Sequence, residues 1–196
     1  NPDVKARTHR YITTGTAQSK FGIDLDTAER LILQEWQAFS SVRLLGFHLH
    51  IGSQIAQSQP FVRAIRRVGS LIERLRRHGV RIDWLNLGGG LGIVYKDERP
   101  QTAEEFARAV LPHLRRLKVR LILEPGRFIV GSAGILVAQV LYCKQTRGKR
   151  FLVVDAGMND LIRPALYSAY HEIVPIAQVS GLRSQVYDVV GPICES

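Results

Sequence analysis

The sequence predicts an α/β protein in which residues 1–132 form the C-terminal part of a TIM-like (β/α)8 barrel and residues 133–196 begin a mainly β second domain. Three observations support this prediction. Strand-like and helix-like patterns alternate through the first part of the chain, which is typical of a parallel sheet. Polar and glycine-rich groups follow each predicted strand, as at the functional rim of such barrels. After about Gly134 the pattern becomes rich in β-type segments.

The predicted helices combine apolar residues at helical spacing with recognisable end signals. Asp26 and Glu29 have the spacing of a capping box, and Thr102 and Glu105 repeat it later in the chain. Pro112 falls inside the helix that follows Thr102, so we expect a kink or break there. The predicted helices cover 26–39, 60–78 with a stop at Gly79, the stretch after residue 102, and 160–170.

The predicted strands are short apolar segments bounded by turn residues. In the first part, their apolar character indicates burial on both faces of a parallel sheet. A complete barrel needs about 250 residues, so the alternating region accounts for roughly half of one. The predicted strands cover 42–51, 82–87 and 119–123 in the first part, and 135–142, 151–154, 173–179 and 185–190 in the second.

Composition narrows the class of protein. Hydrophobic residues make up 45% of the 196 residues and charged residues 22%, which is typical of a globular protein and argues against disorder. No apolar run is long enough to span a bilayer, and no signal peptide is evident. The two cysteines have no metal-like spacing and suggest a reducing cytoplasm. The chain begins without Met and stops directly after an apolar segment, so we expect truncation at both ends.

Basic residues exceed acidic ones by 27 to 17, which gives a formal charge of +10. Many of the arginines fall within 61–78, where apolar residues recur at helical spacing. We interpret them as the solvated face of an amphipathic helix. A nucleic-acid site is the alternative, but no aromatic platform or known module accompanies the arginines.

Candidate site residues follow three successive strands. His48 and His50 alternate on the first and so face one side, a glycine triplet follows the second, and Glu124 and Arg127 follow the third. Glycines allow backbone N–H groups to approach an anion, and an arginine adds a charge-assisted contact. The carboxylate suits a protonated heteroaromatic nitrogen, and the ring of His50 suits stacking on a flat cofactor. Each of these positions also has a simple structural alternative. The glycines could only make a tight turn, Glu124 could form an ion pair with an arginine, and His50 could be a hydrogen-bonded core histidine. We expect no metal site.

Several segments together carry a family resemblance. Residues 46–54 (GFHLHIGSQ), 87–92 (LGGGLG) and 124–127 (EPGR) resemble fold-type III pyridoxal-phosphate decarboxylases. Residues 155–167 (DAGMNDLIRPALY) and 191–196 (GPICES) are similar to the diaminopimelate decarboxylase branch in particular. The matches follow one order along essentially the whole chain. The resemblance implies an alanine racemase-like barrel, a β domain, and a homodimer with shared active sites.

The resemblance also implies a reaction and roles for individual residues. The reaction is loss of carbon dioxide from meso-2,6-diaminopimelate to give L-lysine, with pyridoxal 5'-phosphate as cofactor. His50 would stack on the cofactor ring, Glu124 would pair with its nitrogen, and Cys194 would donate a proton in the partner subunit's site. The remaining roles are phosphate binding by Ser53, Gly88, Gly89, Gly90, Gly126 and Arg127, and substrate binding by Arg127, Arg163, Tyr167 and Glu195.

One feature departs from the family pattern. The family's Schiff-base lysine would lie upstream of Asn1, and none of the lysines at 5, 20, 96, 118, 144 and 149 stands in the matching context. We therefore expect the chain alone to be inactive. The alternatives are a decarboxylase of ornithine, arginine or carboxynorspermidine, and a non-catalytic module that binds phosphate or the cofactor. We expect a small amino-acid substrate, and neither a nucleic acid nor a membrane as partner.

Overall fold

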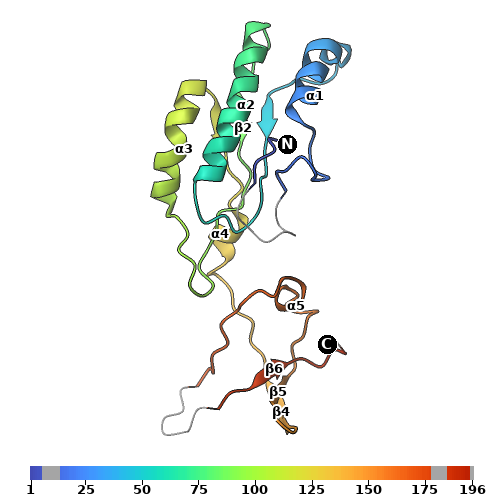
Figure 1. The fold of residues 1–196 in the computed structure, drawn as a ribbon, viewed down its shortest axis with the longest axis vertical. Helices are drawn as coiled ribbons and strands as arrows, with labels where there is room; N and C mark the ends of the chain where they lie inside the picture. Colours follow the sequence, from blue (N-terminus) through green and yellow to red (C-terminus); the bar gives the residue numbers. More distant parts are fainter. Residues whose placement is uncertain (6–13, 178–184, 195–196) are drawn as a thin grey trace. The chain divides into compact units, whose positions relative to one another are not determined.

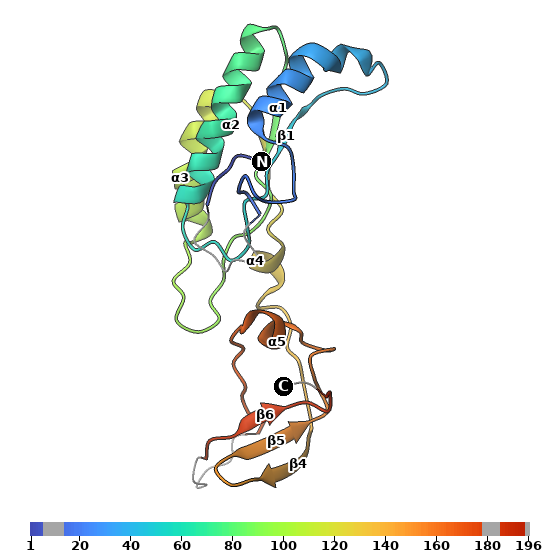
Figure 2. The same ribbon diagram turned by 45° about the vertical axis from the view of Figure 1, so that its right-hand side comes forward.

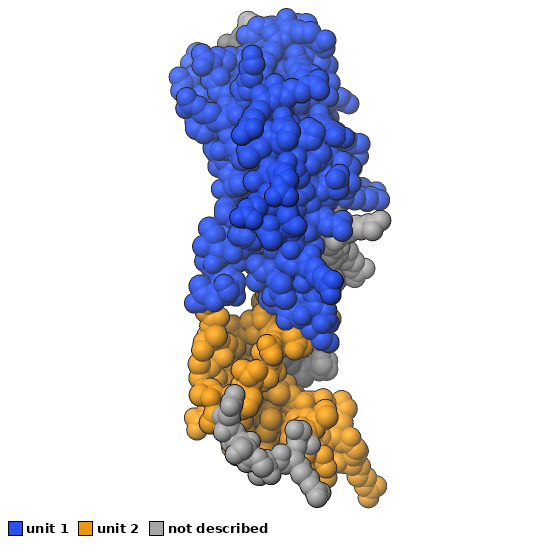
Figure 3. Space-filling view, turned by 90° about the vertical axis from the view of Figure 1, so that its left-hand side faces the viewer, with its two compact units in different colours: residues 1–133 blue, residues 134–196 orange. Residues whose placement is uncertain are grey.

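A computed structural model describes residues 1–5, 14–177 and 185–194 of the chain. The chain divides into two compact units, residues 1–133 and 134–196 (Figure 3). Each unit contains its own three-stranded sheet. In the described part of the chain, no helix is long and apolar enough to cross a membrane.

The first unit is built on a parallel sheet of three short strands. They are β1 (Gly46–His48), β2 (Trp84–Asn86) and β3 (Arg120–Ile122), in the order β1-β2-β3. Both strand pairs are parallel, which confirms the parallel sheet predicted from the alternating pattern. Three strands do not close a barrel, so the structure establishes an α/β fold without showing the barrel itself.

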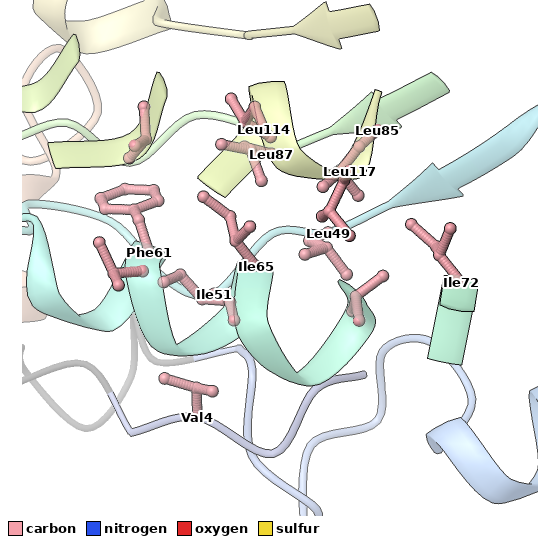
Figure 4. Close-up of a cluster of buried hydrophobic side chains, with 14 of the residues drawn as sticks. Val4, Leu49, Ile51, Phe61, Ile65, Ile72, Leu85, Leu87, Leu114 and Leu117 are labelled. Atoms are coloured by element: carbon pink, nitrogen blue, oxygen red, sulfur yellow. The ribbon is translucent and has the colours of Figure 1, made fainter. Parts of the chain in front are cut away.

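Two long helices cover one face of this sheet. Helices α2 (Gln59–Arg77) and α3 (Ala103–Leu117) lie side by side in both ribbon views (Figures 1 and 2). Their apolar faces meet the inward side chains of the strands in one core (Figure 4). Phe61 and Phe106 pack edge to face in this core. Ile65, Leu75 and Leu85 are fully buried in this core. Burial of apolar surface therefore fixes both helices against the sheet.

Strand lengths differ from the prediction. The segment 42–51 was expected to be one strand, but strand pairing is confined to Gly46–His48. Burial on both faces is also wrong for β3, where Arg120 and Ile122 are exposed. The two helices cover one face only, and the alternate side chains of β3 lie on the other.

The first helix begins two residues earlier than predicted. Asp24, and not Asp26, is the N-cap of α1 (Leu25–Arg30), because its carboxylate accepts a hydrogen bond from the Thr27 N–H at 2.8 Å. The helical path continues through a π-helical turn, Leu31–Glu35, and a 3-10 turn, Trp36–Ala38. The predicted extent to about residue 39 is therefore close to the observed one.

Helix α3 confirms its predicted cap and excludes a break at Pro112, one of the two outcomes predicted there. Thr102 and Glu105 form the predicted capping box, with bonds of 3.1 and 2.9 Å between side chains and backbone N–H groups. Pro112, however, does not break the helix. Phe106, Val110 and Leu114 are buried at helical spacing on both sides of the proline, so core packing holds the helix together where one hydrogen bond is missing.

The basic face of α2 is mostly exposed, as predicted, but several of its arginines also bind neighbouring segments. Arg67 donates to the carbonyl oxygens of Pro2 and Asp3 at 2.7 and 2.8 Å, so it anchors the N-terminal segment. Arg76 donates to the carbonyl of Ile82, and Arg74 donates both its Nε and Nη2 to the carboxylate of Glu29. The pKa of Glu29 is lowered, mainly because its carboxylate accepts hydrogen bonds from Arg74. The arginines thus join α2 to neighbouring segments, which the prediction of a simple solvated face missed.

The second unit is a smaller, β-rich unit. Strands β4 (Val140–Gln145) and β5 (Arg150–Val154) pair antiparallel, and β6 (Asp188–Val190) pairs with β5 in parallel. The short helices α4 (Gly126–Val130) and α5 (Arg163–Tyr167) lie in the first and second unit respectively. The strand expected over 173–179 is not formed within its described part, 173–177.

Candidate active site at the carboxyl ends of the strands

Polar side chains at the ends of β1 and β2 lie on the sheet face opposite the helices. Register pairs His48 with Asn86 and Asn86 with Ile122, so these three residues form one row across the sheet. Their neighbours Leu49, Leu85 and Leu87 are buried in the helix-covered core. Because side chains alternate along a strand, His48 and Asn86 point away from that core.

Backbone hydrogen bonds carry the sheet beyond the ends of the strands. Leu49 N donates to the Asn86 carbonyl at 2.8 Å, and Leu87 N donates to the Ile122 carbonyl at 3.1 Å. One step further, Glu124 N donates to the Gly88 carbonyl at 2.9 Å. The three loops therefore leave the sheet together, which brings the histidines, the glycines and Glu124 to one edge.

The glycine triplet is required first by packing between these loops. Gly88 has a φ of +68°, and a Cβ there would collide with the carbonyl oxygen of Leu49. Gly89 has ordinary φ, but a Cβ there would collide with the carbonyl oxygen of Glu124. Packing between the loops, and not a tight turn alone, therefore requires these glycines. This requirement is compatible with anion binding, since the same lack of Cβ leaves the backbone accessible.

Glu124 is held by two side chains from neighbouring strands. Asn86 Nδ2 donates to Glu124 Oε1 at 2.6 Å, and His48 Nε2 lies 3.5 Å from the same oxygen. Asn86 Oδ1 in turn accepts from Gly88 N at 2.8 Å, so one amide links the glycine loop to the carboxylate. The side chains of His48 and Glu124 are 57% and 49% exposed, so their ion pair contributes little stability. The alternative of an ion pair with Arg127 is not what the structure shows.

His50 lies beside the glycine loop. Its Nδ1 accepts a long hydrogen bond, 3.4 Å, from Gly89 N. Partial removal of the ring from water lowers the pKa of His50, the nearby His48 lowers it further, and Glu124 opposes both effects. A lowered pKa favours the neutral ring at physiological pH.

Arg127 belongs to the same edge but has different partners. Its Nη1 donates to Gln54 Oε1 at 3.3 Å, and its guanidinium carbon lies 5.8 Å from the centre of the Tyr95 ring. Gln54 comes from the loop after β1, directly after Ser53. The guanidinium is therefore held between two side chains, with its remaining donors able to meet an anion.

The structure brings some of the predicted residues together in the first unit, and others belong to the second unit. One edge of the first unit gathers His50, the glycines at 88–90, Glu124 and Arg127. Arg163 and Tyr167 are the first and last residues of α5 in the second unit, and Arg163 Nη1 lies 2.9 Å from His171 Nε2. Cys194 is an exposed free cysteine of the second unit. Glu195 lies outside the described residues.

Two contacts at this edge were not anticipated from the sequence. Asn86 bonds Glu124, and Gln54 bonds Arg127, although both residues are adjacent to motifs that were recognised. The available signal was position: Asn86 is two residues before the first glycine and alternates with buried leucines, which places it on the same face as His48.

Two curated relatives and one solved structure that are similar to this chain are all diaminopimelate decarboxylases. Diaminopimelate decarboxylases of Aquifex aeolicus and Vibrio cholerae are 46% and 45% identical to it over its whole length. A solved structure of diaminopimelate decarboxylase from Helicobacter pylori complexed with L-lysine superimposes with a TM-score of 0.91 at 39% identity, and covers all of this chain. The chain spans about half the length of these relatives, namely 46%, 47% and 48%.

A protein-family model matches nearly all of the first unit. The model described as the pyridoxal binding domain of pyridoxal-dependent decarboxylases matches residues 1–131. This range contains every site residue gathered at the edge of the parallel sheet. The chain therefore belongs to the pyridoxal-dependent decarboxylase family.

Proposed function

We propose that this chain is the central portion of a carboxy-lyase that converts meso-2,6-diaminopimelate to L-lysine with pyridoxal 5'-phosphate as cofactor. The observation that carries the proposal is the convergence of His50, the glycine loop, Glu124 and Arg127 at one edge of the sheet. Whole-length relatives named diaminopimelate decarboxylase support the choice of substrate. Closure of the sheet into a barrel by further strands belongs to the same proposal.

The residues present fit such a cofactor. Gly126 is the informative position, because its φ is ordinary and a Cβ there would meet no atom within 4 Å. Neither backbone conformation nor packing explains a glycine at this site, in contrast to Gly88 and Gly89. Gly126 is exposed and next to Arg127 in the chain, so a phosphate group would reach its backbone without meeting a Cβ.

Glu124 and His50 would recognise the ring of the cofactor. When bound, pyridoxal phosphate supplies an electron-accepting ring for the electron pair left as carbon dioxide departs. Glu124, fixed by Asn86 at 2.6 Å, would hold a proton at the ring nitrogen. The neutral ring of His50 would lie against the cofactor ring, and its lowered pKa avoids placing a second cation there. Asn86 thus orients the group on which the electron sink depends.

The residues assigned to the phosphate belong to the first unit, and further residues assigned to the substrate belong to the second. The glycine loop, Ser53, Gly126 and Arg127 would bind the phosphate, and Arg127 would also contact substrate. In the second unit, Arg163 and Tyr167 share α5 and would bind the substrate's polar groups, together with Glu195. Lysine bound to the Helicobacter pylori relative supports a site that holds an amino acid.

Proton delivery would come from Cys194. Decarboxylation leaves a carbanion that must gain a proton, and a positioned thiol is a suitable general acid. We assign this role to Cys194 acting in the partner subunit's site of a homodimer.

Two free cysteines also fit a reducing compartment, which supports the cytoplasm as the location.

The test uses the full-length protein that contains this chain. With cofactor, we expect carbon dioxide release from meso-diaminopimelate and much less from ornithine, arginine or carboxynorspermidine. Glu124→Gln, which keeps size but removes charge, should lower kcat by about 100-fold or more. Release from ornithine in preference to diaminopimelate would refute the substrate, and an unaffected Glu124→Gln variant would refute the role of the carboxylate.

A further inference from the structure

Gln54 occupies a backbone conformation that is unusual for its residue type. Its φ is +58°, in the left-handed region, which residues other than glycine adopt only at a cost in free energy. It lies in the loop after β1, between Ser53 and the buried Ile55. Such strained residues persist where surrounding contacts hold them, and they concentrate at functional sites.

The side chain of Gln54 extends a short stretch of parallel pairing. Ile55 forms a parallel bridge with Leu91, and Gly92 N donates to the Ile55 carbonyl at 3.1 Å. One step further, Gln54 Nε2 donates to the Ile93 carbonyl at 2.5 Å, while Ile93 N donates to Gln54 Oε1 at 3.1 Å. The side-chain amide therefore takes the place that a peptide group would have in a ladder. Both of its ends are fixed to the backbone after the glycine loop.

This fixed amide also contacts Arg127. Oε1 accepts from Arg127 Nη1 at 3.3 Å in addition to Ile93 N, so both of its lone pairs are used. The ring of Tyr95 approaches the same guanidinium at 5.8 Å. A guanidinium held in this way loses less conformational freedom when it binds an anion than a freely rotating one would.

We propose that Gln54 is a positioning residue that holds Arg127 ready for the phosphate of the cofactor. The inference rests on the proposed function, because it takes the anion at Arg127 to be that phosphate. Gln54 itself need not touch the cofactor. Its neutral amide is important: a carboxylate in the same place would hold Arg127 more firmly and compete with the phosphate for it.

The test is a double-mutant cycle in the full-length protein with Gln54→Met, Arg127→Met and the double variant. Apparent affinities for pyridoxal phosphate and for pyridoxal, which lacks the phosphate, are measured by fluorescence titration. Gln54→Met should weaken pyridoxal phosphate binding about tenfold and leave pyridoxal binding nearly unchanged. In the Arg127→Met background the same change should have little further effect. Gln57→Met, at an exposed position three residues away, is the matched control and should leave both affinities unchanged.

A purely structural role gives a different pattern. In that case Gln54→Met weakens both ligands alike and its effect adds to that of Arg127→Met, which would overturn the inference. If Gln54→Met does not fold, Gln54→Glu decides: it should weaken pyridoxal phosphate at least tenfold relative to pyridoxal, and equal affinities would overturn the inference. Normal cofactor binding without turnover of diaminopimelate would refute the proposed function alone. A wild-type protein that binds no pyridoxal phosphate would refute both.

Discussion

Two glycines of the candidate site should respond in opposite ways to the same substitution. In Gly89→Ala, the new methyl group would collide with the backbone carbonyl of Glu124, an atom that cannot rotate away. In Gly126→Ala, it would meet no atom within 4 Å, and the φ of Gly126 is acceptable to alanine. The pair therefore separates a packing requirement from a requirement for open space.

The magnitude for Gly89→Ala follows from what must move. Overpacking against backbone costs about 1–3 kcal/mol, and the shift strains the bond from Glu124 N to the Gly88 carbonyl, which adds about 1 kcal/mol. We expect a loss of about 2–4 kcal/mol in the free energy of unfolding, or a fall of about 1–2 M in the urea midpoint. Gly126→Ala should be neutral or stabilising by up to about 1 kcal/mol, because alanine reduces the freedom of the unfolded chain.

Urea unfolding of the full-length protein, followed by far-ultraviolet circular dichroism, is a suitable stability assay. Cofactor titration of the same variants adds the functional readout. Gly126→Ala should weaken pyridoxal phosphate binding about tenfold or more despite its normal stability. Equal urea midpoints for the two variants would refute the packing argument, and normal cofactor affinity in Gly126→Ala would refute the assignment of the open space.

Three further outcomes are expected. Asn86→Leu should lose about 1–3 kcal/mol of stability by leaving the Gly88 N–H without its acceptor, and should weaken cofactor binding, both measurable by the same titrations. The pKa of His50, followed by NMR, should lie below its ordinary value of 6.5, and it should fall further in Glu124→Gln because Glu124 raises it. Since the pKa is lowered in the folded state, the stability that the neutral ring contributes is present above pH 6.5 and is lost as the pH falls through the folded-state pKa. Thr102→Ala should cost about 1 kcal/mol by removing the capping box, whereas an unchanged melting temperature would contradict that role.

Local interactions explain which elements could be predicted from the sequence. The capping box at Thr102, the stop of α2 near Gly79 and the parallel sheet all depend on residues close in the chain or on simple periodicity. Element ends were less predictable. The ends of β1 depend on its pairing with β2, which is distant in the chain, and α3 continues through Pro112 because core contacts compensate for a missing hydrogen bond.

The sequence alone determined the residue types of the site: three strands ending in polar or glycine-rich groups, with a histidine, a carboxylate and an arginine among them. Only the tertiary structure decided which of them touch. Glu124 is paired with Asn86 and His48, while Arg127 is held by Gln54, from a loop 73 residues away in the chain. The physical reason is that alternation along one strand assigns a side chain to a face, whereas its partner depends on the register between strands and on how far each loop follows the sheet.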